Sequence, residues 1–211
     1  MTLPEKIRQP GTYILPPVDI SSGASAMQHH LELALRASKD LAGPVELRIP
    51  VCHNRNHWRL ARVTVQQGAV KSAHIWDSMS GRTQTDSSSK NLATAIQRAH
   101  RAQGEPAYAK PVKIRYARLQ RNGHSCMDYC LQRAEKDVGL TTPLTHASTA
   151  PAMRRAITHR IRPRITAETR RSAQWARSRR QADSTKTYTP SFVQRLNRWV
   201  NQLLDEVPQA A

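Results

Sequence analysis

Apolar and polar residues alternate in three consecutive stretches of the chain, at residues 45–51, 57–65 and 70–76. Each stretch is rich in β-branched and aromatic residues, which suit a pleated, half-buried surface. Gln66-Gln67-Gly68, between the second and third stretches, is short enough for a hairpin turn. The pattern therefore predicts three consecutive antiparallel strands.

Other stretches show the period of an amphipathic helix. Apolar residues recur at helical spacing in residues 22–41, where a Gly-Pro pair closes the pattern, and residues 91–103 form a second such stretch. A third helix is expected to begin near Ser125 and to end before Gly139. The remaining stretches predict a loop at residues 78–89 and a strand at residues 112–119. Together these elements predict an α+β fold in which helices flank a mixed sheet.

The two ends of the chain differ in composition from its middle. Residues 1–21 contain four prolines and predict an extended arm that includes one short edge strand. Residues 22–150 hold the predicted strands and helices of a single domain. Residues 151–211 form an Arg-rich helical region, which ends in an amphipathic helix over about residues 190–206. Three segments are therefore expected.

Positive charge dominates the chain. Lys and Arg outnumber Asp and Glu by 33 to 15, so the formal net charge is +18, and residues 152–183 alone hold ten arginines against two acidic residues. Such a segment attracts a polyanion, which at a dedicated site we expect to be a nucleic acid or an inositol phosphate; the equal alternatives are a solvated helical face and a contact with the acidic surface of the protein's own substrate. The dedicated polyanion site is placed at Arg170, Arg171, Arg177, Arg179 and Arg180. Neither a transmembrane stretch nor a secretory signal is present, so we expect a soluble protein.

The chain has three cysteines, Cys52, Cys126 and Cys130, which cannot all pair with one another. An odd number in a chain of this length indicates a reducing compartment and at least one free thiol. Structural zinc usually shows two tight pairs of ligands, which are missing here, so no metal site is expected. We expect Cys130 to be a packed core thiol.

Four residues have the types and positions that a cysteine hydrolase needs. Cys126 falls at a predicted helix start, where the helix dipole and free N–H groups favour the thiolate. His57 begins one predicted strand and Asp77 ends the next, so a hairpin brings base and carboxylate to the same edge of the sheet. Gln120 lies six residues before Cys126, where its amide N–H can reach a developing oxyanion.

At these residues the chain resembles the ubiquitin-like-protein proteases of clan CE, which include SUMO-specific proteases, the adenovirus protease and bacterial effectors. The matching pieces are His57-Trp58, the strand end at residues 75–78, and the stretch Gln-Arg-Asn-Gly-His-Ser-Cys at residues 120–126. The order His, Asp, Gln, Cys is that of the family, and the resemblance covers roughly residues 45–140. Where the family usually has Gly after the nucleophile, this chain has Met127.

The resemblance implies a fold of the adenain or ubiquitin-like protease type, with the catalytic cysteine at a helix N-terminus and residues 22–150 as the catalytic domain. It makes Cys126 the nucleophile, His57 the base, Asp77 its orienting group and Gln120 part of the oxyanion hole. Trp58 would cover the Gly-Gly tail of the substrate. The residues implied for substrate binding are Trp58, Asn122 and Gly123.

The function implied is that of an isopeptidase or peptidase, deubiquitinating or deSUMOylating, that removes ubiquitin or a ubiquitin-like modifier without a cofactor. Its partners would be conjugates of such modifiers. A bacterial effector secreted into the cytosol or nucleus of a host cell is the expected setting. One alternative is a YopJ-like acetyltransferase, which uses the same triad with acetyl-CoA and inositol hexakisphosphate. Another alternative is an inactive module that binds a modifier or nucleic acid; the reason for it is Met127, which stands where the family usually has Gly.

Overall fold

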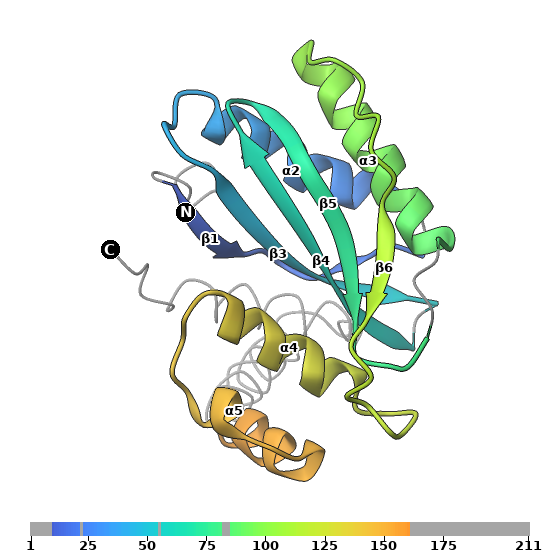
Figure 1. The fold of residues 1–211 in the computed structure, drawn as a ribbon, viewed down its shortest axis with the longest axis vertical. Coiled ribbons are helices and arrows are strands. Elements are labelled where there is room, and N and C mark those ends of the chain that lie inside the picture. The colour runs from blue at the N-terminus through green and yellow to red at the C-terminus, as the bar shows by residue number, and fades with distance from the viewer. Residues whose placement is uncertain (1–9, 22, 55, 82–84, 161–211) are drawn as a thin grey trace, which may run out of the picture.

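The computed structural model describes residues 10–160, except residues 22, 55 and 82–84. Within them, one mixed sheet of six strands has the order β1-β3-β4-β5-β6, and β2 also pairs with β3 (Figure 1). Strands β3, β4 and β5 are antiparallel neighbours, whereas β1 and β2 run parallel to β3, and β6 runs parallel to β5. The strands are β1 (Gly11–Ile14), β2 (Val18–Asp19), β3 (Val45–His53), β4 (His57–Gln66), β5 (Ala69–Asp77) and β6 (Lys113–Tyr116).

The three predicted antiparallel strands are confirmed as β3, β4 and β5. The turn between β4 and β5 consists of Gln67 and Gly68, both with positive φ, at 49° and 76°. Two consecutive residues with positive φ match the right-handed twist of the flanking strands, so they set the register of this hairpin. Residues 10–21 form two short strands rather than the one predicted, because β1 and β2 each pair with a different part of β3.

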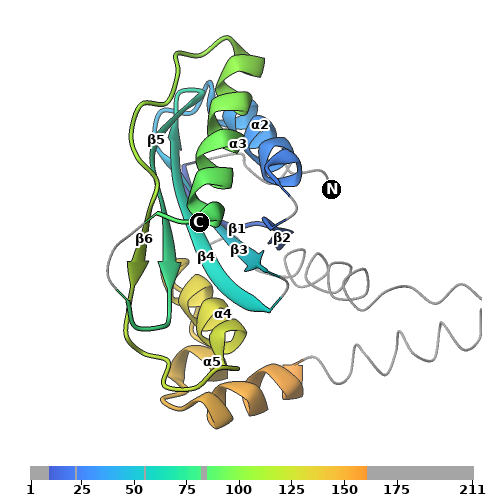
Figure 2. The same cartoon turned by 90° about the vertical axis from the view of Figure 1, so that its right-hand side faces the viewer.

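Helices lie on both faces of the sheet, so the fold is α+β as expected. Helices α2 (Ser25–Ser38) and α3 (Ser87–Gln103) pack side by side on one face, and α4 (Cys126–Asp137) packs against β4 and β3 at the other (Figures 1 and 2). The short α5 (Pro143–His146) and a helix at residues 150–160 follow beside α4. Alternate residues of β4 point to opposite faces, so Ala61 and Val63 face α2 and α3, whereas Leu60 packs with α4.

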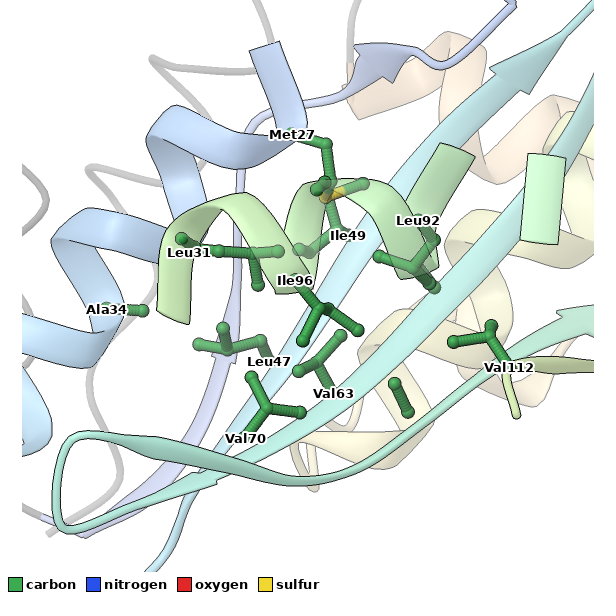
Figure 3. Close-up of a cluster of buried hydrophobic side chains, with 14 of the residues drawn as sticks. Met27, Leu31, Ala34, Leu47, Ile49, Val63, Val70, Leu92, Ile96 and Val112 are labelled. Atoms are coloured by element: carbon green, nitrogen blue, oxygen red, sulfur yellow. The ribbon is translucent and has the colours of Figure 1, made fainter. Parts of the chain in front are cut away.

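The main core lies between the sheet and the pair α2 and α3. Figure 3 shows Met27 and Leu31 of α2, and Leu92 and Ile96 of α3, directed at the side chains of the central strands. All four are fully buried. The period of 3.6 along the helices and of 2 along the strands places these apolar residues on facing surfaces, and their burial is the main stabilising term.

Helix α3 begins four residues before the predicted position. Serine has only moderate helix propensity, which led to the prediction of a loop through Ser89. Asp86 overrides this preference as the N-cap, because its carboxylate accepts hydrogen bonds from the backbone N–H groups of Ser88 and Ser89 at 2.9 and 3.1 Å. The local cap therefore decides the start of this helix.

Strand β6 is shorter than predicted, because the chain turns after Tyr116. Arg118 has a φ of 57°, and the backbone N–H groups of Leu119 and Gln120 both donate to the carbonyl of Ser78, at 2.9 and 2.8 Å. Residues 117–120 are thus tied to the segment that follows β5 rather than extended as a strand. This turn brings Gln120 close to the end of β5.

The end of α4 is joined to the sheet by a buried carboxylate. Asp137, whose side chain is 4% exposed, lies 2.7 Å from Arg48 Nε, 2.9 Å from Arg62 Nε and 2.8 Å from Arg133 Nε. Arg48 and Arg62 stand opposite each other on the neighbouring strands β3 and β4, so both reach Asp137 from the same face of the sheet. Removing the carboxylate would leave these arginines close together without their shared counter-charge.

We therefore expect Asp137→Asn to lower the free energy of unfolding by about 3 kcal/mol, a magnitude typical of breaking a buried ion pair. Glu46→Gln is the matched control, because Glu46 contacts only Arg48 among these arginines, at 3.1 Å, and is 31% exposed. Its expected cost is under about 1 kcal/mol. Urea unfolding measures both, and equal costs for the two variants would contradict the central position of Asp137.

The first part of the Arg-rich region packs against the rest of the described chain. Residues 150–160 are helical, and Met153 is 1% exposed in a cluster with Leu144 and Ala150. The amphipathic helix predicted at residues 190–206 lies outside the described residues. The same holds for the predicted polyanion site, which consists of Arg170, Arg171, Arg177, Arg179 and Arg180.

Candidate active site

The antiparallel pairing of β4 and β5 brings His57 and Asp77 together. His57 is the first residue of β4 and Asp77 the last of β5, so they lie at the same edge of the sheet. His57 Nε2 donates to Asp77 Oδ2 at 2.8 Å. The Asp77 side chain is 1% exposed and that of His57 17% exposed. A buried carboxylate thus holds one nitrogen of the imidazole and orients the ring.

Cys126 reaches the same point from α4, of which it is the first residue. The imidazole of His57 and the backbone N–H groups of Trp58 and Met127 lie within hydrogen-bonding reach of its sulfur, and the thiol also contacts the carbonyl oxygen of Asn56 at 3.9 Å. Cys126 is 3% exposed. The structure therefore assembles Cys126, His57 and Asp77 into one hydrogen-bonded chain from three separate elements.

The pKa values of Cys126 and His57 favour an ion pair between the two side chains. The hydrogen bond from His57 to Asp77, followed by that with Cys126, raises the pKa of His57 to about 9. Burial opposes ionisation of Cys126, but the hydrogen bonds from His57 and from the two backbone N–H groups lower the pKa of this thiol below its ordinary value. Both shifts favour a thiolate beside an imidazolium, which is the reactive form of a cysteine nucleophile.

These two shifts predict a characteristic dependence of stability on pH. The raised pKa of His57 contributes stability that is fully present below about pH 6.5 and is lost as pH rises through about 9. The lowered pKa of Cys126 contributes stability that is present above its ordinary pKa and is lost as pH falls. The two slopes therefore have opposite signs, so the thiol partly masks the pH dependence that His57 contributes above about pH 6.5.

Replacing the thiol should reveal the slope of the histidine. In Cys126→Ala, the bond to Asp77 still raises the pKa of His57, so we expect the free energy of unfolding to fall with rising pH above about 6.5, relative to wild type. The control is the double variant Cys126→Ala with His57→Ala, in which this slope disappears. Urea unfolding at several pH values measures the difference, and identical profiles for the single and double variants would contradict the raised pKa.

Arg59 is a neighbour of the site that the sequence analysis missed. Its Nε donates to Asp77 Oδ2 at 2.7 Å, and its Nη1 donates to Asp86 Oδ2 at 2.6 Å and to Ser88 Oγ at 2.7 Å. The guanidinium therefore links the carboxylate beside His57 to the N-cap of α3. The sequence did carry one signal for Arg59. It lies an even number of residues from Ala61, Val63 and Val65, which places it on the same face of the strand as these apolar residues. A charge on a buried face needs acidic partners.

The orientation of Asp77 depends on further hydrogen bonds. Its Oδ1 accepts from the backbone N–H of Met79 at 2.9 Å, so both carboxylate oxygens are engaged. Burial raises the pKa of Asp77, but the bonds from His57, Met79 and Arg59 outweigh it and lower that pKa below its usual value. The contacts of Asp77 therefore favour its charged form.

The loop before α4 is held by its own side chains. Gln120 is buried, its Oε1 accepts from Ser78 Oγ at 2.7 Å, and its Nε2 donates to the carbonyl of Asn122. Asn122 Oδ1 accepts from the backbone N–H groups of His124 and Ser125, at 3.2 and 3.0 Å. Gly123 is exposed and has open space where a Cβ would stand. In this structure Gln120 and Asn122 thus shape the loop that leads to Cys126.

Trp58 lies half-buried between the sheet and α4. It packs beside a cluster formed by Leu60 and Trp76 of the sheet with Cys130 and Ala134 of α4. Its backbone, as noted, contacts the Cys126 sulfur. The indole therefore lies near the site, and its contacts with this cluster also give it a part in packing.

The other two cysteines differ from Cys126. Cys130 is 1% exposed and donates to the carbonyl of Arg59 at 3.1 Å, and burial raises its pKa well above the ordinary value, so it is an inert core thiol as expected. Cys52 is partly exposed, and none of the three cysteines forms a disulfide. The described residues contain no group of three or more His, Cys, Asp or Glu side chains that could hold a metal ion. No helix among them is long and apolar enough to span a bilayer.

No protein-family model matches the chain, and no curated protein matches it. Among solved structures, the chain is similar to the SUMO protease Ulp1 with its catalytic cysteine oxidised to a sulfonic acid, at 19% identity and a TM-score of 0.47, over 74% of this chain and 71% of that one. It is also similar to the C-terminal Ulp1 protease domain in complex with Smt3, the yeast ortholog of SUMO, at 20% identity and a TM-score of 0.43, over 74% and 70%.

Proposed function

We propose that this chain is a cysteine peptidase of the ubiquitin-like-protein protease type, with Cys126 as nucleophile. One observation carries the proposal: the thiol of Cys126, at a helix start, is hydrogen-bonded to a histidine that a buried carboxylate orients. Nucleophile, base and orienting group are the three parts of a catalytic triad. Their order along the chain and the motif at residues 120–126 support the family assignment.

In the proposed reaction, Cys126 and His57 each act once in each of the two halves. The Cys126 thiolate attacks the carbonyl carbon of the scissile amide, and the carbonyl oxygen takes up the electron pair. As the C–N bond breaks, the His57 imidazolium gives its proton to the leaving amine, and a thioester remains. His57 then accepts a proton from water, which attacks the thioester, and the C–S bond breaks to restore the thiolate.

The oxyanion needs donors that point at the carbonyl oxygen. An amide side chain carries two N–H groups on its nitrogen, and the contact of Gln120 with Asn122 uses only one of them. The second N–H of Gln120 and the backbone N–H at the start of α4 are the donors that we propose. The buried contact of Gln120 with Ser78 holds the amide in place for this role.

The substrate class proposed is a protein modified with ubiquitin or a ubiquitin-like modifier, cleaved after the C-terminal Gly-Gly. Trp58 is proposed to cover this tail, supported by its position directly after His57 and by the contact of its backbone with Cys126. Asn122 and Gly123 complete the proposed substrate site. We further propose a bacterial effector acting in a reducing compartment of a host cell, supported by the family resemblance and by three cysteines that form no disulfide.

The proposal is tested with probes of ubiquitin, SUMO and NEDD8 that carry an electrophile at the C-terminus. We expect at least one probe to label Cys126, identified by mass spectrometry of the modified peptide, and the matching fluorogenic substrate to be hydrolysed. Acetylation of a protein by acetyl-CoA with inositol hexakisphosphate, without labelling by any probe, would identify the acetyltransferase instead. Binding of a modifier without labelling or hydrolysis would identify an inactive binding module.

A further inference from the structure

Arg154 reaches back from the helix at residues 150–160 to the start of α4. Its Nη2 donates to Ser125 Oγ at 2.8 Å, and its Nε donates to Asp128 Oδ2 at 3.0 Å. Ser125 directly precedes Cys126 and Asp128 follows it by two residues. One guanidinium therefore binds the first turn of α4 on both sides of the proposed nucleophile.

The position of Arg154 is set by the packing of its own helix. Met153, next to it, is buried with Leu144 and Ala150, and this cluster also contacts Tyr129 and Leu131 of α4. At the far end of the same helix, Arg160 pairs with Glu135 of α4. The helix is thus attached to α4 at both ends, which directs Arg154 at the turn that begins with Cys126.

Both acceptors of Arg154 are buried. Ser125 is 0% exposed, and its hydroxyl does not cap α4 although it occupies the N-cap position, so Arg154 is the partner that it has instead. Asp128 is 8% exposed, and burial raises its pKa above the usual value even though the bond and charge of Arg154 favour the ionised form. Without Arg154, Asp128 would be a buried carboxylate lacking its cation in the same helical turn as Cys126.

A second negative charge in that turn would disfavour the thiolate. Like charges raise the pKa of an acid, and the effect grows where water is excluded. The other titratable groups around Cys126 and Asp128 are His57 and Arg59 of β4, Asp77 of β5, Cys130 of α4 and His124 of the preceding loop. Among the described residues, the cation that directly binds Asp128 is Arg154.

We propose that Arg154 is a positioning residue for the Cys126 thiol: it fixes the first turn of α4 through Ser125 and neutralises Asp128 beside the nucleophile. This inference rests on the proposed function, because the thiol of Cys126 matters for catalysis only if it is the nucleophile. The contacts of Arg154 act on the thiol itself, so their effect can be tested without any substrate.

The experiment measures alkylation of Cys126 in the full chain by iodoacetamide between pH 5 and 9, with mass spectrometry to separate its peptide from those of the other cysteines. In Arg154→Met we expect the midpoint of the rate against pH to rise by about one unit, a size typical of an unbalanced neighbouring charge. Two matched controls lie on the same helix. Arg155 is exposed, and Arg160 anchors the far end of the helix through Glu135.

Arg155→Met and Arg160→Met should keep the wild-type midpoint, and adding Asp128→Asn to Arg154→Met should return the midpoint most of the way to wild type. An unchanged midpoint in Arg154→Met overturns the proposal. So does an equal rise in Arg160→Met, because helix attachment alone would then explain it. The two proposals can fail separately. If no modifier probe labels the wild-type chain but the midpoint still rises in Arg154→Met, the positioning role is supported and the proposed peptidase activity is not.

Discussion

Replacing Cys126 with Ala is expected to abolish both hydrolysis of a modifier substrate and covalent capture by a modifier probe. The thiol lies at the start of α4, is hydrogen-bonded to His57, and has a pKa lowered in spite of its burial. Covalent catalysis has no substitute for its nucleophile, so kcat/KM should fall by roughly 10⁴-fold or more. A fluorogenic substrate gives the rate, and gel mobility after reaction with the probe gives the capture.

The remaining cysteines provide the controls for this result. Cys52→Ala should retain activity within a few-fold. Cys130→Ala should do so as well, at a cost in stability of about 1–2 kcal/mol, because its sulfur is packed between α4 and β4. Both are compared below the unfolding transition. Capture that persists in Cys126→Ala, or that is lost only in Cys130→Ala, would show that Cys126 is not the nucleophile.

His57→Ala should be nearly as damaging as loss of the thiol. The imidazolium both stabilises the thiolate and supplies the proton for the leaving amine, so two functions disappear together. We expect a fall in kcat/KM of roughly 10⁴-fold at pH 7.

Asp77→Asn should leave more activity, with a loss on the order of 10² to 10⁴-fold, because the ring and the thiol remain in place. Gln120→Ala should fall in the same range.

The rate of the same variants is measured against pH, and their unfolding curves separate a catalytic loss from a structural one. His159→Ala serves as control, because His159 is exposed on the helix at residues 150–160. It should match wild type at every pH. Unfolding curves of His57→Ala should show a folded chain at the assay temperature. A wild-type rate from a folded His57→Ala across neutral pH would rule out the proposed triad.

The sequence alone determined the elements that carry the candidate site. Alternation of apolar residues predicted β3, β4 and β5 as an antiparallel series, and the pattern around Gly139 predicted α4 with Cys126 at its start. Antiparallel pairing then requires that the beginning of one strand meets the end of the next, which places His57 beside Asp77. These are local and nearest-neighbour properties, and periodicity reports them directly. The catalytic roles of these residues stay predictions.

Only the tertiary structure decided which distant charges meet at the site. Arg59 joins Asp77 to Asp86, and Arg154 joins a segment expected to stand apart from the domain to the turn that carries Cys126. A long cationic side chain in a basic sequence has many acidic partners within reach, and its position along the chain does not choose among them. The choice follows from packing, because burial of Met153 and of the β4 face leaves each guanidinium only the carboxylates that the fold brings near it.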